Sequence, residues 1–352
     1  MALPPPASAG TILTVTLNLA LDVTYRAHDV DWNGVNRVRA VHRRAGGKGV
    51  NVARVLSALG REVLVTGLAG GAVGDAARAD LAACGLPAAL TPITGESRTT
   101  LAVSDLSPGE AAPGRPQRTA LFNEPGPVVS AEELDRFLGD FEARLEGAAA
   151  VVISGSLPRG VPAGFYAVLA RRVGERGVPV IVDADGEALR HAPAGRPAIV
   201  KPNAEELTRA LSAAPTPGPA TGPAGPDGSR GASAPAETND PGQALRGAEA
   251  LMDAGAGSVV VSLGADGLLA VTPEGAWRAA MPYRVEGNPT GAGDALVAGL
   301  ALGLVEGDPW PDRLRRAAAL GAAAVAAPVA GDIDADVLRE VEPGIRIEPV
   351  RR

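Results

Sequence analysis

Short apolar runs alternate with helical patterns along most of the chain, and this alternation constrains the fold more than any other feature. The runs are rich in β-branched residues, as buried strands are. Helical patterns separate most of these predicted strands, which lie at residues 11–17, 63–68, 149–153, 178–182, 198–201, 258–262 and 267–271. Strands connected through helices lie parallel in one sheet, and the helices cover both of its faces. The sequence therefore predicts an α/β fold with a mainly parallel central sheet.

Four short segments with alternating apolar residues do not follow this order. They form two pairs without a helix between the members of a pair, at residues 23–28 with 35–42 and at residues 98–105 with 118–123. Such segments indicate a small, mostly solvated β-sheet. We expect it to form a lid, from about residues 18–45 and 97–124, beside the main domain. A stretch rich in Pro and Gly, 107–117, would be its hairpin loop.

The stretch 212–243 is dominated by Pro, Ala, Gly and Ser and shows no hydrophobic periodicity. Such a composition cannot bury enough apolar surface to offset the entropy that is lost when the chain becomes ordered. We therefore expect a disordered surface insertion rather than a linker between two domains. The rest of the chain, 11–345, is expected to form one domain together with its lid.

Charge and cysteine content exclude several classes of protein. The net charge of −7 and the isoelectric point near 5.2 argue against nucleic acid or an anionic membrane as a partner. The longest apolar run, 317–330, is too short and too rich in alanine to span a bilayer. With a single cysteine, Cys84, no intrachain disulfide is possible, so a reducing cytoplasm is the expected location. Without a metal-ligand pattern around it, Cys84 is expected to be a small core residue.

The segment 288–294, Asn-Pro-Thr-Gly-Ala-Gly-Asp, runs directly into an apolar helical stretch. A helix that opens on a Gly-Ala-Gly turn exposes backbone N–H groups without intrahelical partners, and these bind anionic oxygens such as those of phosphate. Gly291 and Gly293 would let the backbone approach the anion closely. Asp294 could then accept a proton from a hydroxyl group while the amides hold the phosphoryl group. The alternative is that Asp294 is an ordinary acidic residue of a first helical turn.

Lysine is almost absent from the chain. Only Lys48 and Lys201 are lysines among 33 basic residues, and all the others are arginine. Lysine and arginine differ most where a compact point charge is required rather than a planar fork. We therefore predict that the segments that hold the two lysines, 45–51 and 200–207, are functional. The alternative is that the two lysines survive by chance.

Taken together, these segments resemble the PfkB (ribokinase-like) carbohydrate kinases over nearly the whole chain, 11–345. The most specific matches are 45–54, continuing to 67–75, and 288–294. Within the family, the chain looks most like the phosphosugar branch, which holds 1-phosphofructokinase, tagatose-6-phosphate kinase and the minor 6-phosphofructokinase. The segments that carry this second likeness are 16–22, 154–160, 183–189, 201–203 and 262–267. Leu19 departs from the branch, which usually has proline there.

The resemblance implies a role for each matching residue. Asp294 matches the catalytic base, and the anion hole for the transferring phosphoryl group matches the amides of Gly291, Ala292 and Gly293. ATP and Mg²⁺ are the implied cofactors. The positions that match the nucleotide site are Lys201, Asn203, Glu206, Ser262, Gly264 and Gly267, and the candidate metal ligands are Asn203, Glu206 and Asp183. The positions that match the sugar site are Asp22, Gly46, Gly47, Lys48, Asn51 and Ser156. Arg37 and Arg98 match lid residues that meet the substrate's phosphate, where a planar fork suits bidentate contact.

The resemblance therefore implies ATP-dependent phosphorylation of an already phosphorylated ketohexose. Fructose 1-phosphate, converted to fructose 1,6-bisphosphate, is the first candidate, with tagatose 6-phosphate and fructose 6-phosphate as alternatives. A kinase of an unphosphorylated sugar or nucleoside and a non-catalytic sugar-phosphate sensor remain open. A homodimer formed through the lid is also implied. A P-loop at 46–49 is disfavoured, because no Ser or Thr follows Lys48.

Overall fold

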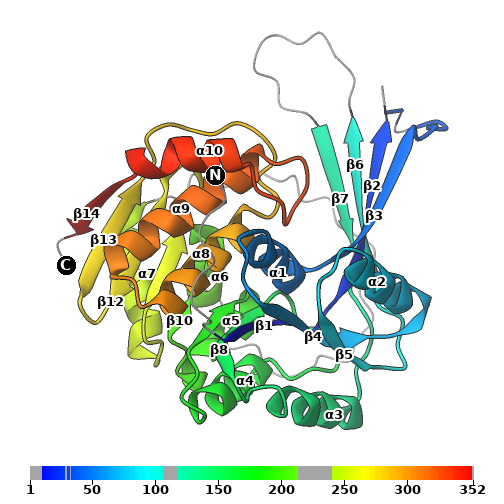
Figure 1. Ribbon diagram of the computed structural model, residues 1–352, viewed down its shortest axis with the longest axis horizontal. Coiled ribbons are helices and arrows are strands. Elements are labelled where there is room, and N and C mark those ends of the chain that lie inside the picture. The colour runs from blue at the N-terminus through cyan, green and yellow to red at the C-terminus, as the bar shows by residue number, and fades with distance from the viewer. Residues whose placement is uncertain (1–9, 28–29, 32, 106–117, 213–239, 351–352) are drawn as a thin grey trace.

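The computed structural model describes residues 10–27, 30–31, 33–105, 118–212 and 240–350. A ten-stranded sheet lies between two layers of helices, and a separate four-stranded sheet projects from one end of this body (Figure 1). The predicted hairpin loop at 107–117 and all but the two ends of the predicted insertion at 212–243 lie outside the described residues.

The large sheet is parallel over most of its width and antiparallel at one edge. Its strands, in spatial order, are β14 (Arg346–Val350), β13 (Gly275–Ala280), β12 (Leu268–Thr272), β11 (Val259–Ser262), β10 (Ile199–Val200), β9 (Val180–Asp183), β8 (Ala148–Ser154), β1 (Thr11–Thr16), β4 (Val63–Ala69) and β5 (Ala88–Pro92). Neighbours from β11 to β5 are parallel, whereas the pairs from β11 to β14 are antiparallel. The prediction of a mainly parallel sheet is confirmed. The sequence pattern does not indicate β5, β13 or β14, whose residues are only partly buried.

Among the described residues, five α-helices cover each face of this sheet, and each layer has its own apolar core. One face carries α1 (Lys48–Ala58), α2 (Gly71–Ala83), α8 (Ala292–Glu306), α9 (Trp310–Ala326) and α10 (Ala335–Val341). The other face carries α3 (Ala131–Glu142), α4 (Phe165–Gly174), α5 (Gly186–His191), α6 (Ala204–Ser212) and α7 (Pro241–Asp253). Helices therefore cover both faces, as predicted.

Helix α8 is buried on all sides rather than along one stripe, since every residue from 294 to 303 is buried. A helix that is apolar all round lies in the interior of a domain. It packs between the large sheet and its neighbours α1 and α9. The first turn of α8 is consequently held in a fixed position relative to the sheet.

The small sheet consists of β2 (Ala20–Ala27), β3 (Ala40–Gly46), β6 (Arg98–Asp105) and β7 (Arg118–Asn123), in the order β3-β2-β6-β7. We call these four strands the lid. The predicted small sheet is confirmed, although β3 begins at Ala40 rather than at Val35. The Asn36 side chain bonds twice to the backbone of Asp31, accepting from its N–H at 2.8 Å and donating to its carbonyl at 2.7 Å. These local bonds compete with strand pairing and keep the residues before Ala40 in a loop.

Cys84, which the sequence places in the core, is exposed instead. It ends α2 at the surface, where its amide donates to the Asp80 carbonyl at 3.0 Å. The Arg54 guanidinium donates to its sulfur at 3.3 Å. In the part of the chain that the structure describes, no helix is long and apolar enough to cross a membrane.

Candidate active site

The first turn of α8 follows a backbone that only glycine adopts easily. Gly291 has φ 87°, and a Cβ there would lie 2.9 Å from the Ala330 Cα. The amides of Gly293 and Asp294 come before the first intrahelical donor, Ala295, so they have no acceptor within the helix. The Ala292 amide, which is predicted to contribute to the anion hole, instead donates to the Pro289 carbonyl at 3.2 Å. The amides of Gly293 and Asp294 are therefore available to bind an anion at this turn, and the role of the Gly291 amide stays a prediction.

Asp294 is a buried carboxyl group with one close partner. It is 5% exposed, and its Oδ2 accepts a hydrogen bond from Asn51 Nδ2 at 2.8 Å. Burial raises the pKa of Asp294 to about 7, against the lowering effect of Lys48. A carboxyl with a pKa in this range exchanges a proton readily at neutral pH, as a general base must.

The two lysines of the chain meet beside this carboxyl. Lys48 Nζ lies 3.2 Å from Asp183 Oδ1 and 3.6 Å from Glu206 Oε1. Lys201 Nζ lies 3.3 Å from the same Asp183 oxygen. It also lies 3.5 Å from the place that a Cβ on Gly293 would occupy, so this ammonium group adjoins the first turn of α8. Burial lowers the pKa of Lys48, but Asp183 and Glu206 raise it further, so Lys48 stays charged.

Asp183 is surrounded by hydrogen-bond donors. Its side chain is fully buried, and Ser154 Oγ donates to its Oδ2 at 3.2 Å while both lysines contact its Oδ1. Burial raises the pKa of Asp183, but Lys201 and Lys48 lower it to below its usual value. Its oxygens are thus held by three donors, and the assignment of Asp183 as a metal ligand stays a prediction.

Asn203 and Glu206 cap the start of α6. Asn203 Oδ1 accepts from the Glu206 amide at 2.7 Å, and Glu206 Oε2 accepts from the Asn203 amide at 2.8 Å. This leaves Glu206 Oε1 facing Lys48, and a carboxylate oxygen is a ligand that Mg²⁺ prefers. Over the described ranges, no group of three His, Cys, Asp or Glu side chains is placed to hold a metal. A Mg²⁺ ion at Glu206 would therefore take most of its ligands from water and phosphate oxygens.

The segment predicted to flank the nucleotide lies directly beside this cap. The Ser262 amide donates to the Pro202 carbonyl at 3.1 Å, and Ser262 pairs with Asn203 in an isolated parallel bridge. The chain then turns through Gly264 and Gly267, whose φ values are 61° and 95°, to enter β12. The structure therefore brings the predicted nucleotide segments together.

A cavity of about 440 Å³ opens between the sheet and the base of the lid. Its lining residues are Thr16, Asn18, Gly47, Lys48, Arg98, Asn123, Glu124, Pro125, Gly155, Ser156, Leu157, Asp185 and Glu206. Gly47, Lys48, Arg98, Ser156 and Glu206 are predicted site residues. Asn18 also lines the cavity, although the motifs do not predict it as a site residue, and its Nδ2 donates to Ser156 Oγ at 3.0 Å. Asn18 lies in the segment 16–22, and the likeness of that segment to the phosphosugar branch is the sequence signal that could have identified it.

Asp22, Gly46 and Arg98 lie where the lid joins the body. A Cβ on Gly46 would lie 2.1 Å from the Asp22 carboxylate, so only glycine fits there. Burial raises the pKa of Asp22, while Arg98 lowers it. The half-buried Arg98 donates from Nε to the Asn18 carbonyl at 3.2 Å and from Nη1 to the Glu124 carbonyl at 3.4 Å. A guanidinium group is thus fixed at the edge of the cavity.

The structure does not bring Arg37 and Arg98 together within one chain. Arg98 pairs with Ala20 at the base of the lid, whereas Arg37 is exposed in the loop before β3. The Arg39 amide bonds to the Arg26 carbonyl, six residues along β2 from Ala20, which is about 20 Å at the rise of a strand. The prediction of a two-arginine clamp therefore fails for a single chain, because the two lid positions lie at opposite ends of the strands.

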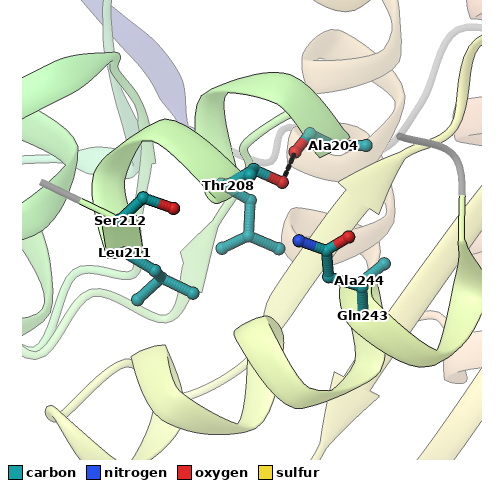
Figure 2. Close-up of a pocket in the computed structure, with 7 residues that line it drawn as sticks. Ala204, Thr208, Leu211, Ser212, Gln243 and Ala244 are labelled. Carbon is teal, nitrogen blue, oxygen red and sulfur yellow. Dashed lines mark hydrogen bonds between the residues drawn. The ribbon is translucent and has the colours of Figure 1, made fainter. Parts of the chain in front are cut away.

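A second, much smaller hollow of about 50 Å³ lies between α6 and α7. Figure 2 shows its lining, where Thr208 Oγ1 donates to the Ala204 carbonyl at 2.9 Å and Leu211 and Ala244 contribute apolar surface. It is too small for a sugar or a nucleotide. The larger cavity at the base of the lid is therefore the candidate substrate site.

An anion-binding helix start, a buried carboxyl group and two lysines close together on an α/β scaffold are typical of enzymes that transfer phosphoryl groups. The chain matches the family model of the pfkB family carbohydrate kinases over residues 16–335. It belongs to this family, and it is a phosphotransferase with an alcohol group as acceptor.

Solved structures of a phosphofructokinase and of a possible 1-phosphofructokinase are similar over almost the whole chain. Phosphofructokinase-2 from Escherichia coli, in complex with potassium, is 28% identical with a TM-score of 0.78, and the match covers 95% of this chain and 98% of that chain. A possible 1-phosphofructokinase from Thermotoga maritima is 26% identical with a TM-score of 0.78, over 97% of this chain and 100% of that one. Both agree with the phosphosugar branch that the sequence motifs indicate. Ribokinase from Arabidopsis thaliana, complexed with ribose and ATP, is 19% identical with a TM-score of 0.64 over 94% of this chain and 98% of that one, which shows the fold alone.

Proposed function

We propose that this protein transfers a phosphoryl group from ATP to a hydroxyl group of a sugar phosphate. The observation that carries the proposal is Asp294, whose pKa is raised to about 7, next to the anion-binding turn at the start of α8. A base that takes a hydroxyl proton near neutral pH works best with a pKa close to that pH. The attacking hydroxyl group and the transferred phosphoryl group would meet at this turn.

Charge neutralisation by lysine and Mg²⁺ supports the same reaction. Phosphoryl transfer requires little covalent chemistry from the protein, so catalysis rests on positioning and on electrostatic stabilisation. Lys201 adjoins the turn of α8, and the Ser262–Gly267 loop adjoins Asn203, so we place the ATP phosphates on this side. Mg²⁺ held at Glu206 would supply further positive charge to the phosphate oxygens.

The acceptor would occupy the cavity at the base of the lid. Arg98 provides a fixed guanidinium group at its edge, and such a group binds a phosphate dianion more strongly than it binds a neutral hydroxyl. We therefore propose a phosphorylated ketohexose as the acceptor, with fructose 1-phosphate first and tagatose 6-phosphate and fructose 6-phosphate as alternatives. The similarity to phosphofructokinase-2 and to the possible 1-phosphofructokinase supports this class of acceptor.

An acceptor panel tests the proposal. ADP release is measured with Mg-ATP and each of fructose 1-phosphate, fructose 6-phosphate, tagatose 6-phosphate, fructose, ribose and adenosine. We expect the highest kcat/KM with a sugar phosphate. A higher kcat/KM with a free sugar or adenosine would show that Arg98 does not select a phosphate. No ADP release with any acceptor, together with stabilisation against heat by a sugar phosphate, would instead support a non-catalytic sensor.

We also propose that two copies of the chain pair through one face of the lid. The strand register places Val23, Tyr25, Val41, Leu101 and Phe122 on the same face. Phe122 is 52% exposed and Val41 is 40% exposed, so this face presents apolar side chains to its surroundings. An exposed apolar sheet face of this kind is typical of an interface between subunits.

Light scattering during gel filtration tests the homodimer. Phe122→Asp should convert the dimer to a monomer, because it places a charge in the apolar face. Leu121→Asp is the matched control, since Leu121 is 51% exposed but lies on the opposite face of the same strand. A wild-type monomer, or equal effects of the two variants, would contradict pairing through this face.

A further inference from the structure

Asp183 stands out because it is a fully buried anion outside the catalytic turn. It ends β9 in the centre of the large sheet and is 0% exposed. Burying a carboxylate is costly unless charged partners and hydrogen bonds compensate for the lost water. Here Lys48, Lys201 and Ser154 compensate, at 3.2 Å, 3.3 Å and 3.2 Å. The fold therefore maintains one buried anion that holds two cations.

The contact that both lysines make with Asp183 explains why positions 48 and 201 hold lysine rather than arginine. Lys48 and Lys201 are the two lysines among 33 basic residues, and their ammonium groups approach the same oxygen, Asp183 Oδ1. Two compact ammonium groups can share one oxygen, whereas a planar guanidinium fork is suited to both oxygens of a carboxylate. The geometry at Asp183 thus favours lysine at each position in a chain that otherwise uses arginine.

Each lysine has a further neighbour in the site besides Asp183. Lys201 Nζ lies beside Gly293, where the anion would bind, and Lys48 Nζ extends to Glu206 Oε1 at 3.6 Å. A lysine side chain has several rotatable bonds, so its ammonium group needs an anchor to stay in one place. Asp183 is the anchor that both side chains have in common.

We propose that Asp183 is a positioning residue that fixes Lys48 and Lys201 beside the first turn of α8, where the phosphoryl group would be transferred. The inference rests on the proposed kinase function and adds a residue that does not itself contact the substrate. Without the Asp183 charge, the two ammonium groups repel each other and leave their places. Electrostatic groups that are fixed in advance contribute to the transition state without reorganisation, and losing one lowers kcat by about 10²–10³-fold.

Kinetics of Asp183→Asn test the proposal. We expect kcat to fall at least about 100-fold while the KM values for ATP and the sugar phosphate change less than about fivefold, a split that general unfolding would not produce. Ser154→Ala is the matched control, because it removes the third partner of Asp183 and leaves both lysine contacts intact. A kcat for Asp183→Asn within about threefold of the wild type would overturn the proposal.

A double-mutant cycle addresses folding and mechanism together. Asp183→Asn combined with Lys201→Met removes one charge of each sign and retains the pair of Lys48 with Glu206. If Asp183 acts through the lysines, its replacement in the Lys201→Met background should have less than about a tenth of its effect in the wild type. Equal effects in the two backgrounds would overturn the proposal.

A spectroscopic readout is independent of activity. Because the chain has two lysines, labelling with ¹⁵Nζ-lysine gives one NMR signal for each ammonium group in the cluster. Asp183→Asn should shift or broaden both signals, whereas Ser154→Ala should preserve them. Unchanged signals in Asp183→Asn would overturn the positioning role. If the wild type had no kinase activity but its lysine signals still depended on Asp183, the kinase function would be contradicted and the positioning role would not.

Discussion

Replacing Asp294 with asparagine separates a catalytic base from a structural residue of the first helical turn. The amide has the same shape as the carboxylate, and its oxygen can still accept the hydrogen bond that Asn51 donates at 2.8 Å. It cannot take a proton from a hydroxyl group. We expect Asp294→Asn to lower kcat by about 10²–10⁴-fold, which is the usual contribution of general base catalysis, with little change in the KM for ATP.

The same substitution should change stability in a direction that depends on pH. The pKa of Asp294 is raised from 3.8 to about 7, so the folded protein loses about 4 kcal/mol of stability as the pH rises from 4 through 7 and the buried carboxyl ionises. Asparagine does not ionise and does not suffer this loss. Asp294→Asn should therefore be more stable than the wild type at pH 8, and the difference should shrink toward pH 4.

Two measurements check this reasoning. The kcat/KM of the wild type should rise with pH to a plateau, with a midpoint near 7, and thermal unfolding at pH 5 and pH 8 should show the predicted difference between the two proteins. Asp312→Asn is the matched control, because Asp312 lies in the first turn of α9 as Asp294 does in α8, but at the surface. Near-normal turnover by Asp294→Asn would refute the assignment of the base. A variant that is no more stable at pH 8 would refute the argument from burial.

Two further predictions concern the lid and the insertion. Arg98→Ala should lower kcat/KM for the preferred sugar phosphate at least about tenfold, because charge-assisted hydrogen bonds contribute roughly 1.5–3 kcal/mol. Residual use of free fructose should be affected far less. Equal losses for both acceptors in the ADP-release assay would contradict a phosphate contact. Replacing residues 213–239 with a short Gly-Ser linker should change the Tm by less than about 2 °C, because loop-closure entropy changes slowly with length and the flanking helices pack directly, with Leu207 against Gly247. A large loss of Tm would show that the segment packs against the domain.

The sequence predicts the fold best where strands are buried on both sides. β1, β4 and β8 are nearly continuous apolar runs, and the structure places them inside the sheet, each with a parallel neighbour on both sides. β13 and β14 are half exposed at the antiparallel edge, so their sequences carry no comparable run. The pattern of residues reports burial rather than strand pairing, and edge strands are consequently missed.

The sequence identifies individual residues of the candidate site but not the contacts between them. Local motifs identify Asp294, Lys48 and Lys201, because glycine-rich turns and rare lysines stand out along the chain. The separation of Arg37 from Arg98 follows from the lengths and register of the lid strands, which no local pattern specifies. The three donors around Asp183 come from β8, α1 and the end of β10, so their convergence depends on the whole sheet.

The body of the domain carries the groups proposed for the chemistry, and the lid carries the proposed contact to the phosphate of the acceptor. Asp294 lies in the first turn of a helix that is buried on all sides, and Asp183 ends a central strand, so the two carboxyl groups cannot move without disrupting a core. Arg98 instead begins a lid strand, and β2, its neighbour, begins beside it. A displacement of the lid would thus affect the proposed phosphate contact more directly than it affects Asp294 or Asp183. Selection of the acceptor and transfer of the phosphoryl group are therefore separable, and variants at Arg98 and Asp294 should have independent, additive effects on kcat/KM.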